Sequence, residues 1–160
     1  MLKRLLKNER GLTLIELLAV IVILGIIAAI AIPAIGAIID NSKKDAHIAN
    51  AKQMANAARL AISANEIDEN NVDANGVITL TMQDLYNKGF LEKIPKSPGD
   101  KGAYNQTESK VVVSKDTTNG QRTYDVKLVG TTGGHVYIDT TTADTKDVDN
   151  LQRNDVNLGR

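Results

Sequence analysis

Cysteine is absent from the 160 residues of this sequence, and aromatic residues make up only 3% of it. The lack of cysteine excludes disulfides, thiolate metal sites and lipid attachment through a cysteine. The sequence also lacks a P-loop, a G-x-S-x-G elbow and an H-E-x-x-H motif, the signatures of several nucleotide-binding and hydrolytic enzyme classes. We therefore expect no catalytic residue and no enzyme activity. Any folded domain must be held together by burial of its apolar side chains.

Charge is missing from one long stretch of the chain, because no charged or strongly polar side chain occurs from Leu17 to Ile39. Such a run suits a membrane-spanning helix, which needs about 20 apolar residues. An excess of basic residues before the first apolar span places the N-terminus in the cytoplasm. We therefore expect a single pass, with residues 40–160 outside the cytoplasm. The charged residues of the preceding segment are Lys3, Arg4, Lys7 and Arg10 against Glu9.

An ordinary cleaved secretory signal is the alternative interpretation of this segment. The apolar region of such a signal is usually about 7–15 residues long and is followed by a cleavage site of small residues. Ala29-Ile30-Ala31 has suitable side chains for that site. The apolar run continues beyond it to Ile39, which is too long for a simple signal, so we prefer the membrane helix.

Glu16 is the only charged residue between Arg10 and Asp40, and a carboxylate within a membrane segment is costly. One interpretation places Glu16 near the membrane surface, where it reaches headgroup water. The other gives Glu16 a cationic partner. Cleavage between Gly11 and Leu12 would create an α-amino group, which could pair with the Glu16 of a neighbour in a filament of staggered subunits. A poorly solvated ion pair favours one register, because a shifted register leaves charges unpaired.

The residues around Glu16 match a known signature. Gly11 is followed by Leu-Thr-Leu-Ile-Glu, a long apolar run and Pro33, and the segment from Lys7 to Pro33 resembles the prepilin signal of type IV pilins and pseudopilins. The resemblance implies that a prepilin peptidase cuts between Gly11 and Leu12 and N-methylates Leu12, where the family usually has Phe. It implies an assembly role for Glu16 together with Leu12. It also implies a kinked or loosened helix at Gly25, Pro33 and Gly36.

The same resemblance implies the partners and the location of the chain. The partners would be other copies of the chain in a helical homopolymer, the prepilin peptidase, an inner-membrane assembly platform with its assembly ATPase, and minor pilins. Before assembly the chain would lie in a bacterial or archaeal-type cell membrane, and afterwards in a filament at the cell surface.

The fold that we expect is α+β and type IV pilin-like, with a long N-terminal helix packed on a small antiparallel sheet. The predicted parts are a cleaved leader (1–11), a transmembrane or filament-core helix (12–39) and an extracytoplasmic globular domain (40–160). An amphipathic helix should continue to about residue 64, because apolar residues recur at steps of three and four. These residues are Ile48, Ala51, Ala55, Ala58 and Ile62.

The rest of the globular domain should contain a linking region (65–109), a sheet (110–139) and a C-terminal loop or tail (140–160). Within the linking region a short helix at 80–87 should begin at Thr81 and stop at Gly89. The downstream segments Asp84–Leu91 and Ile94–Pro98 resemble the link between helix and sheet in some pilins and secretion pseudopilins. Strands predicted at 110–115, 123–129 and 135–139 are separated by Asn-Gly and Gly-Gly pairs, which favour hairpin turns.

Two further groups of residues could suggest chemistry. Carboxylates are the ligands that Ca²⁺ prefers, and four acidic residues cluster late in the chain: Asp139, Asp144, Asp147 and Asp149. Their spacing fits no EF-hand, so we favour a solvated acidic loop and expect no cofactor, with Ca²⁺ as the open alternative. His47 should lie on the helix surface and His135 at a strand edge, neither in a catalytic or metal motif.

The leading hypothesis is a structural subunit, the major pilin of a type IV pilus that serves adhesion, twitching motility or DNA uptake. The alternative is the major pseudopilin of a type II secretion or competence system. A third hypothesis is a single-pass membrane protein with an extracytoplasmic binding domain, which would keep its N-terminal segment and form no polymer. We expect no direct nucleic-acid site, because the basic residues of the outer helix have no aromatic residues among them for base stacking.

Overall fold

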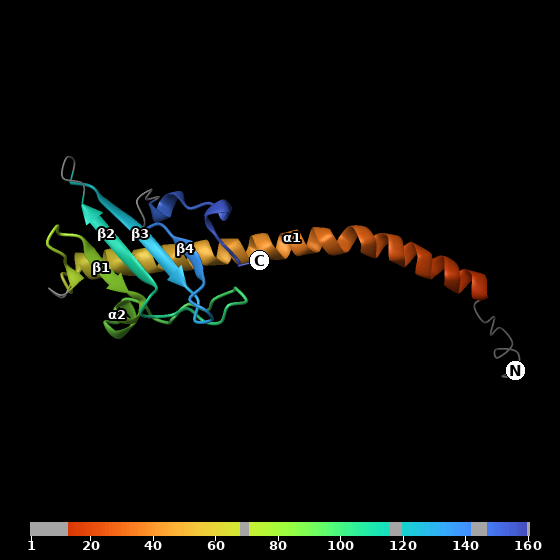
Figure 1. The fold of residues 1–160 in the computed structure, drawn as a ribbon, viewed down its shortest axis with the longest axis horizontal. Helices are drawn as coiled ribbons and strands as arrows, with labels where there is room; N and C mark the ends of the chain where they lie inside the picture. The colour runs from red at the N-terminus through yellow and green to blue at the C-terminus, as the bar shows by residue number, and fades with distance from the viewer. Residues whose placement is uncertain (1–12, 68–70, 116–119, 142–146, 160) are drawn as a thin grey trace, which may run out of the picture. The chain divides into compact units, whose positions relative to one another are not determined.

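A computed structural model describes residues 13–67, 71–115, 120–141 and 147–159 (Figure 1). The chain divides into two compact units, Met1–Ile39 and Asp40–Arg160. A long apolar helix and a small antiparallel sheet confirm the predicted α+β class. The elements in chain order are α1 (Leu14–Ser63), β1 (Ile78–Thr81), α2 (Met82–Asn87), β2 (Lys110–Lys115), β3 (Arg122–Val129), β4 (Val136–Asp139) and the 3-10 helices η3 (Val148–Asn150) and η4 (Arg153–Asp155).

The described part of the first unit is a single stretch of helix. It begins at Leu14 and continues through Pro33 without interruption. Sixteen large apolar side chains between Leu14 and Ile39 expose 48–85% of their surface, so the described part of the first unit does not bury them by itself. Helix α1 is long and apolar enough to cross a membrane. We treat residues 14–39 as the membrane-spanning part.

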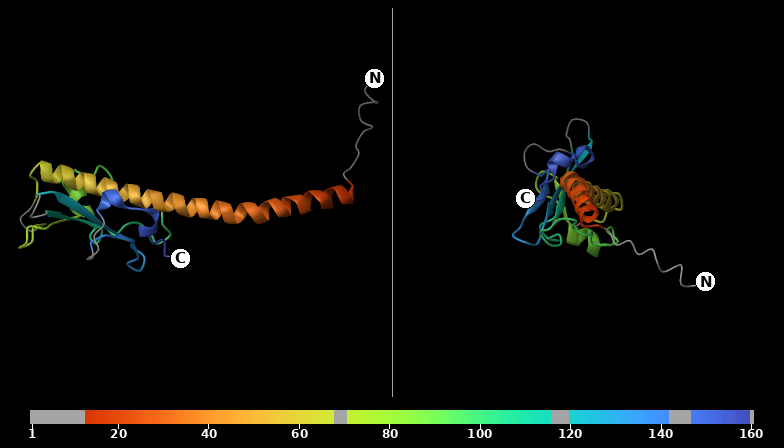
Figure 2. Two further views of the ribbon diagram at one scale, coloured as in Figure 1. Left: turned by 90° about the horizontal axis from the view of Figure 1, so that it is seen from above. Right: turned by 90° about the vertical axis from the view of Figure 1, so that its right-hand side faces the viewer.

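The second unit is built on a four-stranded antiparallel sheet in the order β1-β2-β3-β4 (Figure 1), with the part of α1 after Asp40 along one face (Figure 2). Side chains alternate between the two faces of a strand, and the register brings the apolar positions of neighbouring strands opposite each other. Val111 on β2 pairs with Val126 on β3, and Val113 pairs with Tyr124. All four are buried, so one face of the sheet forms the floor of the core.

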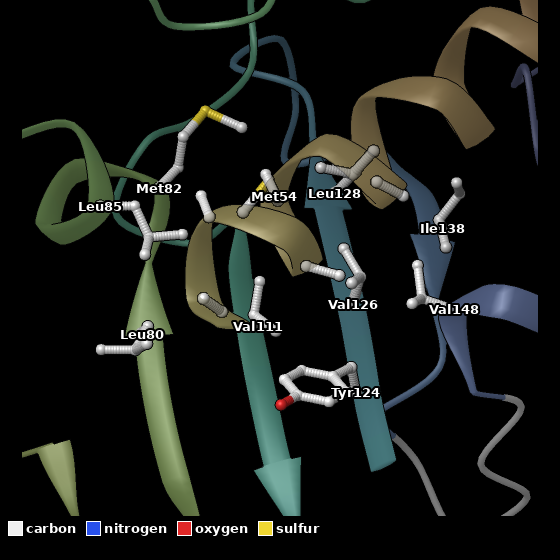
Figure 3. Close-up of a cluster of buried hydrophobic side chains, with 14 of the residues drawn as sticks. Met54, Leu80, Met82, Leu85, Val111, Tyr124, Val126, Leu128, Ile138 and Val148 are labelled. Atoms are coloured by element: carbon white, nitrogen blue, oxygen red, sulfur yellow. The ribbon is translucent and has the colours of Figure 1, made fainter. Parts of the chain in front are cut away.

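The part of α1 that follows Asp40 covers this face. Its buried positions are mostly alanine, which allows the helix backbone to come close to the sheet. Met54 is the large apolar side chain among them, and it belongs to the same buried cluster as Val126 and Leu128 of β3 (Figure 3). The predicted apolar stripe is confirmed at Ala51, Ala55 and Ala58, which are fully buried, and its Ile48 and Ile62 are partly buried against the core. The fully buried residues of this face that the prediction left out are His47, Met54 and Ala61.

The sheet differs from the prediction by one strand. Strand β1 pairs with β2 and places Leu80 opposite Val111, so the sheet begins at Ile78 and has four strands instead of three. The prediction missed β1 because it has only four residues and leads directly into α2. The helix start was predicted correctly. Thr81 caps α2 in a reciprocal pair of bonds with Asp84.

The C-terminal segment is irregular, as a loop is, but its described part (147–159) is not a free tail. Val148, Leu151 and Val156 are buried in the core. Two ion pairs also join the segment to α1. Asp149 accepts from Arg59 at 2.7 Å, and Arg153 donates two bonds of 2.7 Å to Asp45.

Candidate functional site

The lone carboxylate of the apolar segment lies in the first turn of α1. Oε2 of Glu16 accepts the backbone N–H of Thr13 at 2.7 Å and the Thr13 hydroxyl at 2.8 Å. The backbone N–H of Glu16 in turn donates to the Thr13 hydroxyl oxygen at 3.3 Å. This reciprocal arrangement is a capping box, which satisfies donors that a helix start otherwise leaves unpaired. The helix dipole also favours a negative charge at this end.

The two oxygens of the Glu16 carboxylate are used differently. Both bonds from Thr13 reach Oε2, while Oε1 has no hydrogen-bond partner among the residues that the structure describes. An ionised carboxylate accepts at both oxygens. A cation could therefore bind Oε1 without breaking the cap of α1.

No charge on the described part of α1 lies near enough to neutralise Glu16. The next charged residue, Asp40, follows 24 positions later, or about 36 Å along a helix, and it is acidic. A cationic partner must therefore come from the segment before Thr13 or from another molecule. Gly11 and Leu12, the predicted cleavage pair, lie outside the described residues.

The residues of the predicted kink lie within an unbroken helix. Pro33 has no backbone N–H, so the carbonyl of Ala29 lacks its usual helical donor. A Cβ placed on Gly25 or on Gly36 would meet nothing within 4 Å, so packing within one chain does not require glycine there. The kink stays a prediction.

The described candidates for calcium have partners within the protein. Asp139 accepts from Thr141 and pairs with Lys127 at 3.1 Å. Asp147 accepts from the backbone of Tyr124 and of Asp149. Asp149 itself pairs with Arg59. Asp144 lies outside the described residues, and among those described no three acidic or histidine side chains are grouped to bind a metal.

The prediction for His47 is wrong, because its side chain is fully buried. The ring stacks on Tyr137 with centroids 4.1 Å apart, and Nδ1 lies 2.6 Å from the Tyr104 hydroxyl. Burial, helped by the charges of His135 and Lys43, lowers the pKa of His47 to about 4. The spacing of His47 four residues before Ala51, on the apolar stripe, could have indicated this position.

Asp125 is a second buried ionisable residue, and the sequence analysis did not single it out. It alternates with the core residues Tyr124 and Val126 and so points to the other face of the sheet, yet it exposes only 3% of its surface. Burial, with a smaller effect from the charge of Asp147, raises the pKa of Asp125 to about 6. The sequence gave no sign that Asp125 would be buried, because an acidic residue that alternates with core residues on a strand is expected to face solvent.

Comparison with known proteins agrees with the signature at the start of α1. Residues 6–32 match a family described as the prokaryotic N-terminal methylation motif. No curated protein and no solved structure matches the chain.

Proposed function

We propose that this chain, which its N-terminal methylation motif identifies as a prepilin of the type IV pilin or pseudopilin class, is the major subunit of a type IV pilus. The motif implies processing by a prepilin peptidase and membrane anchoring before assembly. The chain would act by polymerisation and not by catalysis. The filament would lie at the cell surface and serve adhesion, twitching motility or DNA uptake.

The observation that carries the proposed polymerisation is the state of Glu16. Its carboxylate is tied to Thr13 through Oε2 and has Oε1 free of partners within the described chain. Cleavage after Gly11 would give Leu12 an α-amino group. Such a group has a pKa near 8 in model peptides and is largely cationic at neutral pH. The Leu12 amine of a neighbouring subunit would then bind Oε1 while the cap of α1 stays in place.

The apolar side chains of residues 14–39 support the same conclusion. Leaving them in water would cost on the order of 20 kcal/mol or more, since each buried large side chain contributes about 1.5–3 kcal/mol. A membrane removes these side chains from water, and so does a bundle of identical helices. Moving α1 between these two surroundings therefore changes its apolar burial little. The charge pair of Glu16 is the interaction that a bundle offers and a lipid bilayer does not.

The first test is mass spectrometry of the mature protein from cells and from sheared filaments. We expect a chain that begins at Leu12 and carries one added methyl group. A chain that retains its leader and is never recovered as a fibre would contradict the proposal and favour a plain membrane protein.

The second test uses two substitutions of Glu16. Glu16→Gln keeps an acceptor for Thr13 but removes the charge, and Glu16→Ala removes both. We expect both variants to insert into the membrane normally and both to lose at least about tenfold in filament yield, because the unpaired amine costs several kcal/mol in an apolar bundle. Normal filament yield from Glu16→Gln would refute the pairing.

A major pseudopilin is the alternative within the same class. It predicts the same processing and the same effect of Glu16 substitutions, because both depend on the segment before residue 40. Electron microscopy of cells at native expression separates the two: long surface fibres support the pilus, and fibres that appear only on overexpression support the pseudopilus.

A further inference from the structure

Two lysines of α1 come directly after the membrane-spanning segment. Lys43 and Lys44 are the fourth and fifth residues after Ile39, which places them within about 8 Å of it along the helix. The headgroup layer outside the hydrocarbon core is about 5–7 Å thick on each side of a bilayer. Both ammonium groups are therefore within reach of lipid headgroups while the chain is in the membrane.

A loop of the second unit brings two more lysines to this part of α1. Asp100 accepts from Lys43 at 2.8 Å, and Lys101 follows Asp100 directly in the chain. The backbone oxygen of Lys96 accepts from Asn50 of α1 at 3.0 Å. The loop 96–101 is thus fixed beside the first turns of α1 that follow the membrane segment.

The charges in this region are not balanced. Residues 40–45, 96–101 and 153 carry five basic and three acidic side chains, whereas the rest of residues 40–160 carry ten basic and fourteen acidic ones. Lys43 is paired with Asp100, and Arg153 with Asp45. Three further lysines form no ion pair with any residue that the structure describes, and we call them the basic surface: Lys44, Lys96 and Lys101.

The position of the basic surface runs against the usual distribution of charge around a membrane span. Lysine and arginine are normally in excess on the cytoplasmic side. Once the leader is cut off after Gly11, however, no lysine or arginine precedes Lys43. The basic residues nearest the membrane in the mature chain then all lie on its outer side, where an anionic lipid would be a favourable partner.

We propose that the basic surface binds the phosphate groups of anionic phospholipids in the outer leaflet of the membrane that α1 spans. Because α1 tethers these lysines to the bilayer, lipid phosphate is present there at a high effective concentration, which favours it over a soluble anion. The contact would hold the second unit at the membrane before assembly and would be released when the chain enters a filament. It rests on the membrane anchoring that the proposed function includes.

The test uses the full chain in two kinds of lipid nanodisc, one of phosphatidylcholine and one of equal parts of phosphatidylcholine and phosphatidylglycerol. The chain has no cysteine, so Ala103→Cys, at an exposed position near Lys101, gives a single site for a fluorescent label. A lipid with a spin-labelled headgroup quenches this label when the loop approaches the membrane surface. We expect quenching at least about twofold stronger in the nanodiscs with phosphatidylglycerol, and a smaller difference in high salt.

Charge substitutions locate the contact. A labelled protein with Lys44→Gln, Lys96→Gln and Lys101→Gln should lose most of the difference between the two lipids. The matched control has the same net charge and should keep the difference, because its three substitutions lie elsewhere in the second unit: Lys52→Gln, Lys110→Gln and Lys115→Gln.

The amount of chain recovered with the nanodiscs separates this proposal from the proposed function, and the measurement needs no filament. A chain that does not enter the nanodiscs would contradict the membrane anchoring and, with it, the lipid contact. Equal quenching in both lipids, by a chain that does enter them, would overturn the lipid contact alone. An equal loss in the matched control would also overturn it, because it would show attraction by net charge.

Discussion

Asp125 and His47 are both buried in the second unit, and burial moves their pKa values in opposite directions. We predict that these two groups oppose each other in the pH dependence of stability. The free energy of unfolding of the unmodified protein should then change little between about pH 4 and pH 6.5. Removing either group should expose the slope that the other one produces.

The magnitudes follow from the two pKa shifts. Asp125 has a pKa of about 6 when folded against a normal value of 3.8. Between these values the folded state binds more protons, so stability falls as pH rises, by about 3 kcal/mol. His47 has a folded pKa of about 4 against 6.5. Here the unfolded state binds more protons, so stability rises with pH, by about 3 kcal/mol across the window.

Asp125→Asn replaces the carboxyl group by a neutral group of the same shape, and so removes the decrease in stability that Asp125 causes as pH rises. Its free energy of unfolding should rise by about 3 kcal/mol from pH 4 to pH 6.5. His47→Asn leaves Asp125 in place and should show the opposite slope, whatever its starting stability, because only the raised pKa of Asp125 then acts in this window. Three carboxyl groups with lowered pKa values lose their stabilising effect below pH 3.8, outside this window: Asp45, Asp73 and Asp139.

Urea unfolding of the full chain in dodecyl maltoside micelles measures these slopes. Tyrosine fluorescence reports on the same core, because Tyr104 and Tyr137 are fully buried within it. Slopes of the same sign in the Asp125→Asn and His47→Asn proteins would refute the reasoning. A slope in Asp125→Asn equal to that of the unmodified protein would refute the assignment to Asp125.

Three other substitutions have expected outcomes. Thr13→Val removes one of the two donors to Glu16 and should lower filament yield much less than loss of the carboxylate does, while Thr13→Ser should assemble normally. Gly99→Ala places a Cβ against the ring of Tyr137 and should lower the free energy of unfolding by about 1–3 kcal/mol in urea titrations. Arg153→Gln breaks two short bonds to Asp45, but both side chains are about half exposed, so it should lower the free energy of unfolding only slightly, and less in high salt.

The sequence predicts well those elements whose signals are long or local. The apolar run and the alanine stripe identify α1, because each extends over several helical turns. Thr81 identifies the start of α2, because a cap depends on neighbours three residues away. Strand β1 has no comparable signal. Four residues alternating twice are too few to separate a strand from the start of the helix that follows.

The burial of several residues could not be predicted from the sequence, because it depends on packing between distant segments. Val148, Leu151 and Val156 are spread among polar residues, so their burial depends on where η3 and η4 meet α1 and the sheet. His47 and Asp125 are polar residues that are nevertheless buried, and His47 packs against Tyr104 and Tyr137, which lie more than 50 positions away. A local pattern assigns such residues to the surface, because most polar residues lie there.

The site at Glu16 could be predicted in part from the sequence, and the structure supplies the rest. A single charge in an apolar run is visible in the sequence, and so is the Thr-x-x-Glu pattern of a capping box. The structure adds that the box uses Oε2 and leaves Oε1 without a partner among the described residues.

This division of the carboxylate bears on the energetics of assembly. The bonds from Thr13 are available to an isolated α1 in a membrane and to an α1 in a bundle, so they lower the cost of the charge in both states. They therefore contribute little to the difference between the two states. The bond from a neighbour's amine to Oε1 is available only in the bundle, so it favours assembly over the membrane state. For this reason we expect the charge of Glu16 to control filament yield more strongly than the hydroxyl of Thr13. A larger loss of filament yield in a Thr13→Val protein than in a Glu16→Gln protein would contradict this expectation.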